Sequence, residues 1–512
     1  MRPPVLFFVF LLSVAAALAA DSQEALQRAA ELVQQGRLQE ADQQAHLALK
    51  DPQTRAVACS VLGTIRFQQK HLEESVSLFQ EAIRLDPRLL GAHLSLAEVY
   101  VVQGKPQQAL PLFRHVLSLD PSNAAARLAL ARSETEKGKY RESLDVAKPT
   151  RAAFKQSADG LLVLATDYSK LGNREATAAL AKDWSRLDGV PPDWSIKFAL
   201  RLAQGGAAAE AVQLLEGVKR SSQTSYELAF NLAGAYALNK DLAHALDSYD
   251  EALSYNPQSL PALRQAAGIA EQRGELERSL SYWMKAKKLA ADDPEILLGF
   301  GRVCLKMDLL EDAEPALTKA ASLRPKNPLY QYTLAAAKTG KRQFEAAEQL
   351  LQSLVRSQPN DSQLEYALGS VLYLEGHLPD AATHLEESVR LQPQQFASYY
   401  YLALVARDQG NDADALQRLE KLLQQYPEHG ASNEVLGELL MGARRYPEAE
   451  TALRKAVQLN PKSIKANYQL GLLLARMGKK EEADKQLAMA KTLRTEDESN
   501  SRLQLRLLDP DQ

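Results

Sequence analysis

The sequence predicts an all-α solenoid of about fourteen repeats, each with 34 residues that form a helix, a turn and a second helix. Three observations support this fold class. Prolines recur at a fixed interval, small residues recur at two positions within the interval, and glycines recur near its middle. A helix pair of this size cannot bury its apolar face alone, so such repeats must stack on their neighbours.

The spacing of the prolines fixes the register of the array. Counting the proline as position 32 of each repeat, the first repeat begins at Ser22 and the fourteenth ends at Asp497, with no insertion. Eight prolines lie 34 residues apart or at a multiple of 34: Pro87, Pro121, Pro257, Pro325, Pro359, Pro393, Pro427 and Pro461.

Small residues occupy positions 8 and 20 of every repeat. Position 8 is always Ala or Gly, as at Gly369, and position 20 is never larger than Thr. The pattern indicates two helices whose backbones approach closely. Position 15 is Gly in nine repeats, where Gly can take a positive φ and end the first helix. Apolar residues follow a helical and not an alternating period within each half-repeat.

These positions resemble the tetratricopeptide repeat family, whose small residues stand at positions 8, 20 and 27 and whose proline stands at 32. The resemblance extends over nearly the whole chain. It implies a right-handed superhelix of stacked helix pairs, in which the first helices line a concave groove. Such arrays chiefly hold proteins or peptides.

The regularity predicts two arms, residues 22–147 and 226–497, that flank an irregular joint at residues 148–225. Pro149 falls inside the second helix of the fourth repeat, so that helix should end or kink near Ala147. Trp184 stands at a position that is usually small. The alternative is sequence drift at a tolerant surface without a change of structure.

The two ends have their own signals. Residues 1–20 combine Arg2 with an apolar run and a small-residue cleavage site, which predicts a secretory signal peptide. An uncleaved anchor is the alternative, although the run is shorter than the roughly 20 residues that a spanning helix needs. Residues 498–512 are expected to form a cap or a tail, as a short helix or an extended segment.

Composition argues against several classes of function. The net charge of −3 has no block of either sign, so neither nucleic acid nor an anionic membrane is an expected partner. Cys59 and Cys304 lie too many repeats apart to form a disulfide. The eight histidines show no metal-binding spacing, and no catalytic or nucleotide-binding motif is present. We expect no enzyme activity, cofactor or metal.

The resemblance places positions 2, 5, 6, 9, 12 and 13 of the first helices in the groove. Position 5 is mostly aliphatic in the first arm and joint, and mostly aromatic in the second arm. Tyr and Arg often carry binding energy at interfaces. Packing against the neighbouring repeat is the alternative role for these side chains. The candidate groove residues are Phe230, Tyr332, Tyr366, Tyr373, Tyr400, Tyr401, Arg407, Tyr468 and Arg476.

We therefore predict an exported, non-enzymatic scaffold, periplasmic or secreted and bacterial, that binds a protein or peptide in its groove. An extended peptide with apolar and acidic side chains would suit the aromatic strip. The alternative is an accessory subunit of a machine for polysaccharide or glycan synthesis or export, which recruits substrates for catalysis on another chain.

Overall fold

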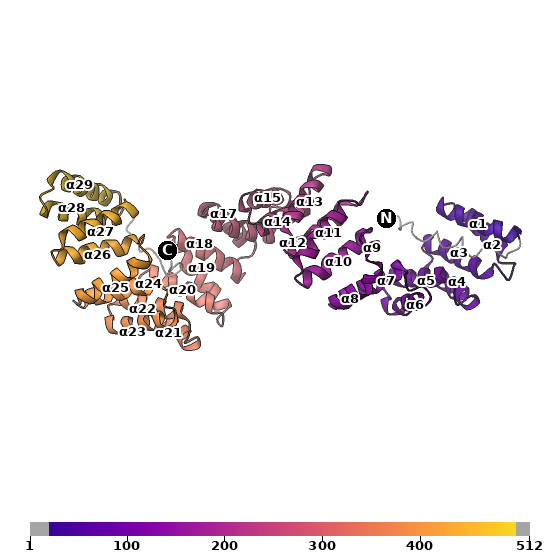
Figure 1. Ribbon diagram of the computed structural model, residues 1–512, viewed down its shortest axis with the longest axis horizontal. Helices are drawn as coiled ribbons and strands as arrows, with labels where there is room; N and C mark the ends of the chain where they lie inside the picture. Colours follow the sequence, from indigo (N-terminus) through magenta and orange to yellow (C-terminus); the bar gives the residue numbers. More distant parts are fainter. Residues whose placement is uncertain (1–19, 498–512) are drawn as a thin grey trace. The chain divides into compact units, whose positions relative to one another are not determined.

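The computed structural model describes residues 20–497, and the regular secondary structure of this range is entirely helical (Figure 1). The chain divides into an N-terminal unit, Met1–Tyr255, and a C-terminal unit, Asn256–Gln512. The predicted signal peptide, apart from Ala20, and the predicted tail at 498–512 lie outside the described residues. No helix within 20–497 has the length and apolar character needed to cross a membrane.

The N-terminal unit holds seven helix pairs and one short irregular insertion. Its helices are α1 (Ala20–Gln34), α2 (Leu38–Ala48), α3 (Arg55–Gln68), α4 (Leu72–Leu85), α5 (Leu90–Val102), α6 (Pro106–Leu119), α7 (Ala124–Glu136), α8 (Tyr140–Ala147), the 3-10 turn η2 (Lys148–Thr150), α9 (Arg151–Phe154), α10 (Ala158–Lys170), α11 (Arg174–Trp184), α12 (Pro192–Gln204), α13 (Ala208–Ser221), α14 (Tyr226–Leu238) and α15 (Leu242–Tyr255).

The C-terminal unit holds the other seven pairs. Its helices are α16 (Leu260–Gln272), α17 (Leu276–Leu289), α18 (Pro294–Lys306), α19 (Leu310–Leu323), α20 (Pro328–Gly340), α21 (Phe344–Ser357), α22 (Ser362–Glu375), α23 (Leu378–Leu391), α24 (Phe396–Asp408), α25 (Asp412–Gln425), α26 (Gly430–Gly442), α27 (Tyr446–Leu459), α28 (Ile464–Arg476) and α29 (Lys480–Asp497).

Within each unit, consecutive helices pack as antiparallel neighbours, and successive first helices of the pairs also contact one another. Examples are α16 with α18 and α22 with α24. The second helices of successive pairs do not contact one another as closely as the first helices do, except for α11 and α13. The first helices therefore lie on the inner side of each curved stack. The prediction of an all-helical solenoid with about fourteen helix pairs is confirmed.

Position 8 of the first helix packs against position 24 of the second helix in the same repeat. A Cβ atom added to Gly369 would lie 2.7 Å from Cγ of Leu385, and one added to Gly437 would lie 2.5 Å from Cγ of Leu453. Carbon atoms do not approach this closely without displacement, so the small residue sets the distance between the two helices. The expected close backbone approach is confirmed.

Position 15 takes a left-handed backbone conformation in all fourteen repeats. The nine predicted glycines do so, with φ reaching 87° at Gly376. In the other five repeats the same conformation is held by side-chain-bearing residues: Lys70, Lys240, Asp308, Arg342 and Arg444. Residues other than glycine usually avoid positive φ, but the turn between the two helices of the repeat requires it at this position.

The prediction at Pro149 is confirmed, because α8 ends at Ala147 and is followed by η2 and α9. The irregular repeats have a hydrophobic core of their own. Phe154 is 1% exposed, and Trp184 stacks on Phe198 with ring centroids 4.0 Å apart. One continuous cluster of buried residues runs from Ala131 to Ala235. The unusual large residue is thus part of a packed core of the irregular repeats.

The two compact units meet in sequence at the connection between α15 and α16. The predicted joint at 148–225 lies within the N-terminal unit, and its boundaries remain a prediction.

Cys59 and Cys304 are both free and buried, and burial raises the pKa of the Cys304 thiol to about 12. A thiol with so high a pKa is a poor nucleophile at neutral pH.

The N-terminal unit also buries a carboxyl group. Asp167 on α10 is 0% exposed, and its Oδ1 accepts a hydrogen bond of 2.8 Å from Oγ1 of Thr135 on α7. Its Oδ2 is buried without a hydrogen-bond partner. Burial raises the pKa of Asp167 to about 6, against the hydrogen bonds from Ser143 and Thr135 that lower it. The charged form is therefore unfavourable in the folded state.

We expect Gly369→Leu to reduce the free energy of unfolding by about 1–3 kcal/mol, because the added side chain overpacks the contact with Leu385. The matched control is Gly268→Leu, since an added Cβ at Gly268 has no atom within 4 Å. Chemical denaturation followed by circular dichroism measures both variants. Equal stability of the two variants would contradict the packing described here.

We expect Asp167→Asn to stabilise the fold at pH 7 by up to about 3 kcal/mol, since the pKa of Asp167 is raised from 3.8 to about 6 and one pKa unit corresponds to about 1.4 kcal/mol. The pKa of Asp167 is higher in the folded than in the unfolded chain. Its favourable contribution is therefore complete below about pH 4 and is lost as pH rises through about 6. Denaturation of both proteins at pH 4.5 and pH 7.5 tests this. If the free energies of unfolding of the wild type and Asp167→Asn differ by the same amount at both pH values, the raised pKa of Asp167 is refuted.

Candidate functional site

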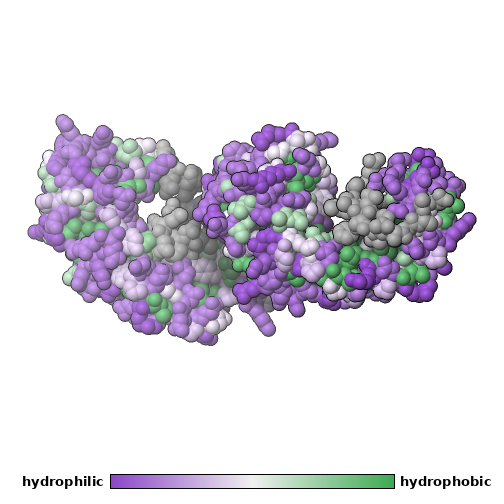
Figure 2. Space-filling view, turned by 45° about the vertical axis from the view of Figure 1, so that its right-hand side comes forward, coloured by the Kyte–Doolittle hydropathy of each residue, from purple (hydrophilic) through white to green (hydrophobic). Residues whose placement is uncertain are grey.

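The candidate site is the first-helix face of the C-terminal unit, where α20, α22, α24, α26 and α28 lie in succession. The 34-residue register puts equivalent positions of these helices in rows. Position 5 contributes Tyr332, Tyr366, Tyr400, Glu434 and Tyr468. In the visible face of Figure 2 most of the surface is hydrophilic, and hydrophobic residues form small separate patches.

Four tyrosines from α22 and α24 form one cluster, which we call the tyrosine cluster: Tyr366, Tyr373, Tyr400 and Tyr401. Tyr401 is at its centre, with ring centroids 5.9 Å from Tyr366, 5.6 Å from Tyr373 and 5.6 Å from Tyr400. All three contacts are edge-to-face, the arrangement that aromatic quadrupoles favour. The cluster therefore joins two neighbouring repeats.

The members of the tyrosine cluster differ in exposure. Tyr366 is only 1% exposed, whereas Tyr373, Tyr400 and Tyr401 are partly exposed. Tyr400 also lies edge-on to His429, the residue that directly precedes α26, with centroids 5.3 Å apart. Tyr366 thus forms the floor of the cluster, and the other three rings form its accessible part.

Polar contacts fix the edge of the cluster next to α26. The Tyr373 hydroxyl donates a hydrogen bond of 2.8 Å to Oδ2 of Asp408, and Nε of Arg407 donates one of 2.7 Å to Oδ1 of the same carboxylate. Burial and the hydrogen bond to Asp408 raise the pKa of Tyr373 well above its usual value. Tyr373 therefore remains a neutral hydroxyl at physiological pH.

The charge of Arg407 is already matched inside the protein. Besides Asp408, its guanidinium lies 3.9 Å from Oε2 of Glu438 on α26, and its side chain is 23% exposed. Lys465 on α28 is 2.8 Å from the same Glu438. Neighbouring first helices are linked by the same kind of pair elsewhere, as between Arg302 and Glu271 at 2.6 Å. The face is therefore close to neutral where the tyrosines lie.

A second polar network begins at Tyr332 on α20. Its hydroxyl accepts a hydrogen bond of 2.8 Å from Nε2 of Gln363, whose Oε1 accepts one of 3.0 Å from Nε2 of Gln395. Gln395 is 2% exposed, and its amide oxygen accepts a hydrogen bond of 3.1 Å from Ser388. The tenth and eleventh repeats are thus joined by uncharged side chains.

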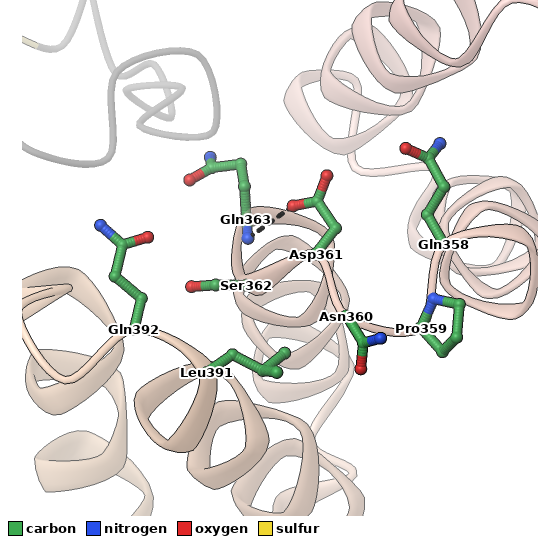
Figure 3. A pocket seen from close by; sticks show the side chains of 8 residues that line it. All are labelled: Gln358, Pro359, Asn360, Asp361, Ser362, Gln363, Leu391 and Gln392. Carbon is green, nitrogen blue, oxygen red and sulfur yellow. Dashed lines mark hydrogen bonds between the residues drawn. The ribbon is translucent and has the colours of Figure 1, made fainter.

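Gln363 also borders a polar cleft of about 570 Å³, which lies where the connection from α21 to α22 meets the end of α23 (Figure 3). Figure 3 shows amide groups of Gln358, Asn360, Gln363 and Gln392 around it. Asp361 also lines the cleft, and its Oδ1 caps α22 by accepting from the backbone nitrogens of Gln363 and Leu364. The cleft offers amide donors and acceptors.

The remaining predicted residues lie apart from the tyrosine cluster. Tyr468, which is 46% exposed, and the exposed Arg476 are on α28. Phe230 belongs to α14 in the N-terminal unit, where its ring packs with Tyr226 and Tyr249 at 5.6 and 5.7 Å. The structure thus brings together five of the nine predicted residues, namely the tyrosine cluster and Arg407.

Sequence reasoning missed the polar partners of the site: Gln363, Gln395, Asp408, Glu438 and Lys465. Four of them, all except Gln395, stand at positions 2, 9 and 13 of first helices, which the same register assigns to the groove face. A comparison of adjacent positions in successive repeats would have found the pairs of Tyr332 with Gln363 and of Tyr373 with Asp408, since these contacts join one repeat to the next.

Several solved structures resemble the chain. A tetratricopeptide repeat protein from Parabacteroides merdae is 18% identical, over 49% of this chain and 98% of that chain, with a TM-score of 0.41. Yeast Tom70 is 16% identical, over 96% of this chain and 99% of its own, with a TM-score of 0.37. A chain of the APC/C hetero-tetramer Cut9-Hcn1 is 14% identical, over 82% and 96%, with a TM-score of 0.40. No curated protein gives a significant match.

Three sequence profiles of the tetratricopeptide repeat match the chain. The first matches residues 366–430, 400–464 and 434–491, the second 101–166 and 305–371, and the third 56–89 and 226–259. Together these matches cover more than half of the sequence, and their register agrees with the helix pairs described above. The chain therefore belongs to the tetratricopeptide repeat family.

Proposed function

We propose that the protein is an exported scaffold, of bacterial origin, that binds an extended segment of a partner protein on the first-helix face of α20–α24. Members of the family are typically non-catalytic scaffolds for protein–protein interaction. The observation that carries the proposal is the tyrosine cluster, in which three partly exposed rings rest on a buried fourth ring.

The chemistry of this face suggests what the segment is like. Tyrosine rings bury large apolar area at little cost in conformational entropy, and they are frequent hot spots of interfaces. The amides of Asn360 and Gln392 are exposed beside the cleft and can pair with peptide groups of an extended chain. Because Arg407 is already paired with Asp408 and Glu438, an apolar segment of low net charge fits better than an acidic one.

Export is supported by residues 1–20, whose apolar run and cleavage pattern are typical of a secretory signal peptide. The accessory-subunit alternative uses the same face and differs in the identity of the partner. In that case the bound protein would be a component of polysaccharide or glycan synthesis or export. Fractionation of the producing cell tests the location directly, and recovery of the protein in the cytoplasm with residues 1–20 intact would contradict export.

We expect the double variant Tyr400→Ala, Tyr401→Ala to bind the partner at least about thirtyfold more weakly, since loss of one hot spot costs about 2 kcal/mol or more. The partner is first identified by pull-down with the wild-type mature chain, and its affinity is then measured by calorimetry.

The matched control for this experiment is Tyr399→Ala. Tyr399 is the preceding residue of α24, but its hydroxyl bonds to the carbonyl of Pro393 and Lys421 lies over its ring, so it points away from the cluster. Equal affinity of the double variant and the control, with both folded, would place the binding site elsewhere.

A further inference from the structure

A group of metal-ligating side chains lies at the junction between the tenth and eleventh repeats, outside the tyrosine cluster. Glu348 is on α21, Glu375 is the last residue of α22, and His377 directly precedes α23. One ligand atom from each residue lies within 4.8 Å of the others. The Nδ1 atom of His377 is 3.9 Å from Oε2 of Glu375.

A comparison of equivalent junctions shows that this one lacks a positive charge. Glu348 stands at position 21 of its repeat, and an acidic residue stands there before three other junctions. At each of those, a basic residue of the next repeat pairs with it. The pairs are Asp42 with Arg66 at 2.7 Å, Glu314 with Lys338 at 2.5 Å and with Lys341 at 3.3 Å, and Glu450 with Lys479 at 2.7 Å.

The basic residues of those pairs stand at positions 11, 14 and 16 of their repeats. In the eleventh repeat the same three positions hold Leu372, Glu375 and His377. The acid that elsewhere meets a lysine or an arginine here meets a second carboxylate and an imidazole. A cation is therefore missing from a place where the other junctions of this protein supply one from the chain.

The electrostatic environment of these side chains also favours a bound cation. Glu375 is at the C-terminus of α22, where the helix dipole favours positive charge. Glu348 and Glu345 add further negative charge around Glu375. Oε2 of Glu375 is buried without a hydrogen-bond partner, and the side chain is 14% exposed.

The three side chains are also placed as ligands. Nε2 of Gln352 donates a hydrogen bond of 2.7 Å to Oε1 of Glu348, which orients that carboxylate as an outer-sphere residue does. The imidazole of His377 makes no capping hydrogen bond and is 58% exposed, so it can turn toward the carboxylates. Zinc bonds of about 2.0–2.2 Å to oxygen and nitrogen place two ligand atoms about 3.5 Å apart, which needs only a small adjustment here.

We propose that Glu348, Glu375 and His377 bind a zinc ion that joins the tenth and eleventh repeats in place of the missing basic side chain. Two carboxylates and one imidazole leave a fourth position for water, which suits zinc, whereas magnesium prefers oxygen ligands alone. The site links α21 to the connection between α22 and α23. It does not depend on the proposed binding of a partner.

The test uses the full mature chain, without an affinity tag and freed of metal by EDTA. Zinc chloride is titrated by calorimetry, and thermal unfolding is followed with and without zinc. We expect one zinc ion to bind and to raise the melting temperature, because a ligand that binds only the folded state stabilises it. Magnesium at the same concentration should leave the melting temperature unchanged.

Variants locate the ion. Glu375→Gln and His377→Gln should each weaken zinc binding at least about tenfold, while Glu314→Gln, the equivalent acid of the preceding junction, should bind zinc as the wild type does. Glu375→Lys restores the lysine found at position 14 of the tenth repeat, and it should raise the melting temperature without zinc and abolish the response to zinc. No zinc binding at millimolar concentration, or equal binding by wild type and Glu375→Gln, would overturn the proposal.

Discussion

The close contact between position 8 and position 24 of each repeat is the constraint on which the rest of the structure depends. Glycine or alanine at position 8 lets the second helix approach until a leucine, such as Leu385 over Gly369, touches the backbone of the first helix. The contact recurs with the period of the sequence, so the regular helix pairs share one geometry. Residues at equal positions consequently form rows on the first-helix face, and the rows of positions 5, 6 and 12 supply the tyrosine cluster.

The face that results is held together across repeats by contacts of modest individual strength. Partly exposed ion pairs contribute about 0–1 kcal/mol each, and their value here is mainly to fix neighbouring first helices in register. Arg302 with Glu271 and Lys465 with Glu438 do this with charge, and Tyr332 with Gln363 does it without charge. Because these pairs neutralise the face, its aromatic rings and amides are the groups left to recognise a partner.

Much of the fold could be predicted from the sequence, because the repeat pattern is a property of single positions. Position 15 predicted the turn between helices, and Pro149 predicted the end of α8. The burial of Tyr366 could not be predicted in the same way, since it depends on Tyr401, which stands at a different position of the next repeat. The pairing of Arg407 with Glu438 was missed for the same reason.

Two further features required the three-dimensional structure. Phe154, Trp184 and Phe198 fill the irregular repeats, and nothing in the 34-residue pattern indicates that the residues that break it pack together. Glu348 is 27 residues from Glu375 in the sequence, so no local metal-binding motif joins them. In both cases the missing information is the contact between successive repeats.

The central claim is that the first-helix face around the tyrosine cluster binds the partner. Hydrogen exchange of the full chain, measured with and without the identified partner, tests it most directly. The account predicts that protection on binding is strongest in α22 and α24, and weak in α23 and α25, which form the opposite layer of the same repeats. Protection confined to α23 and α25, with α22 and α24 unchanged, would contradict it.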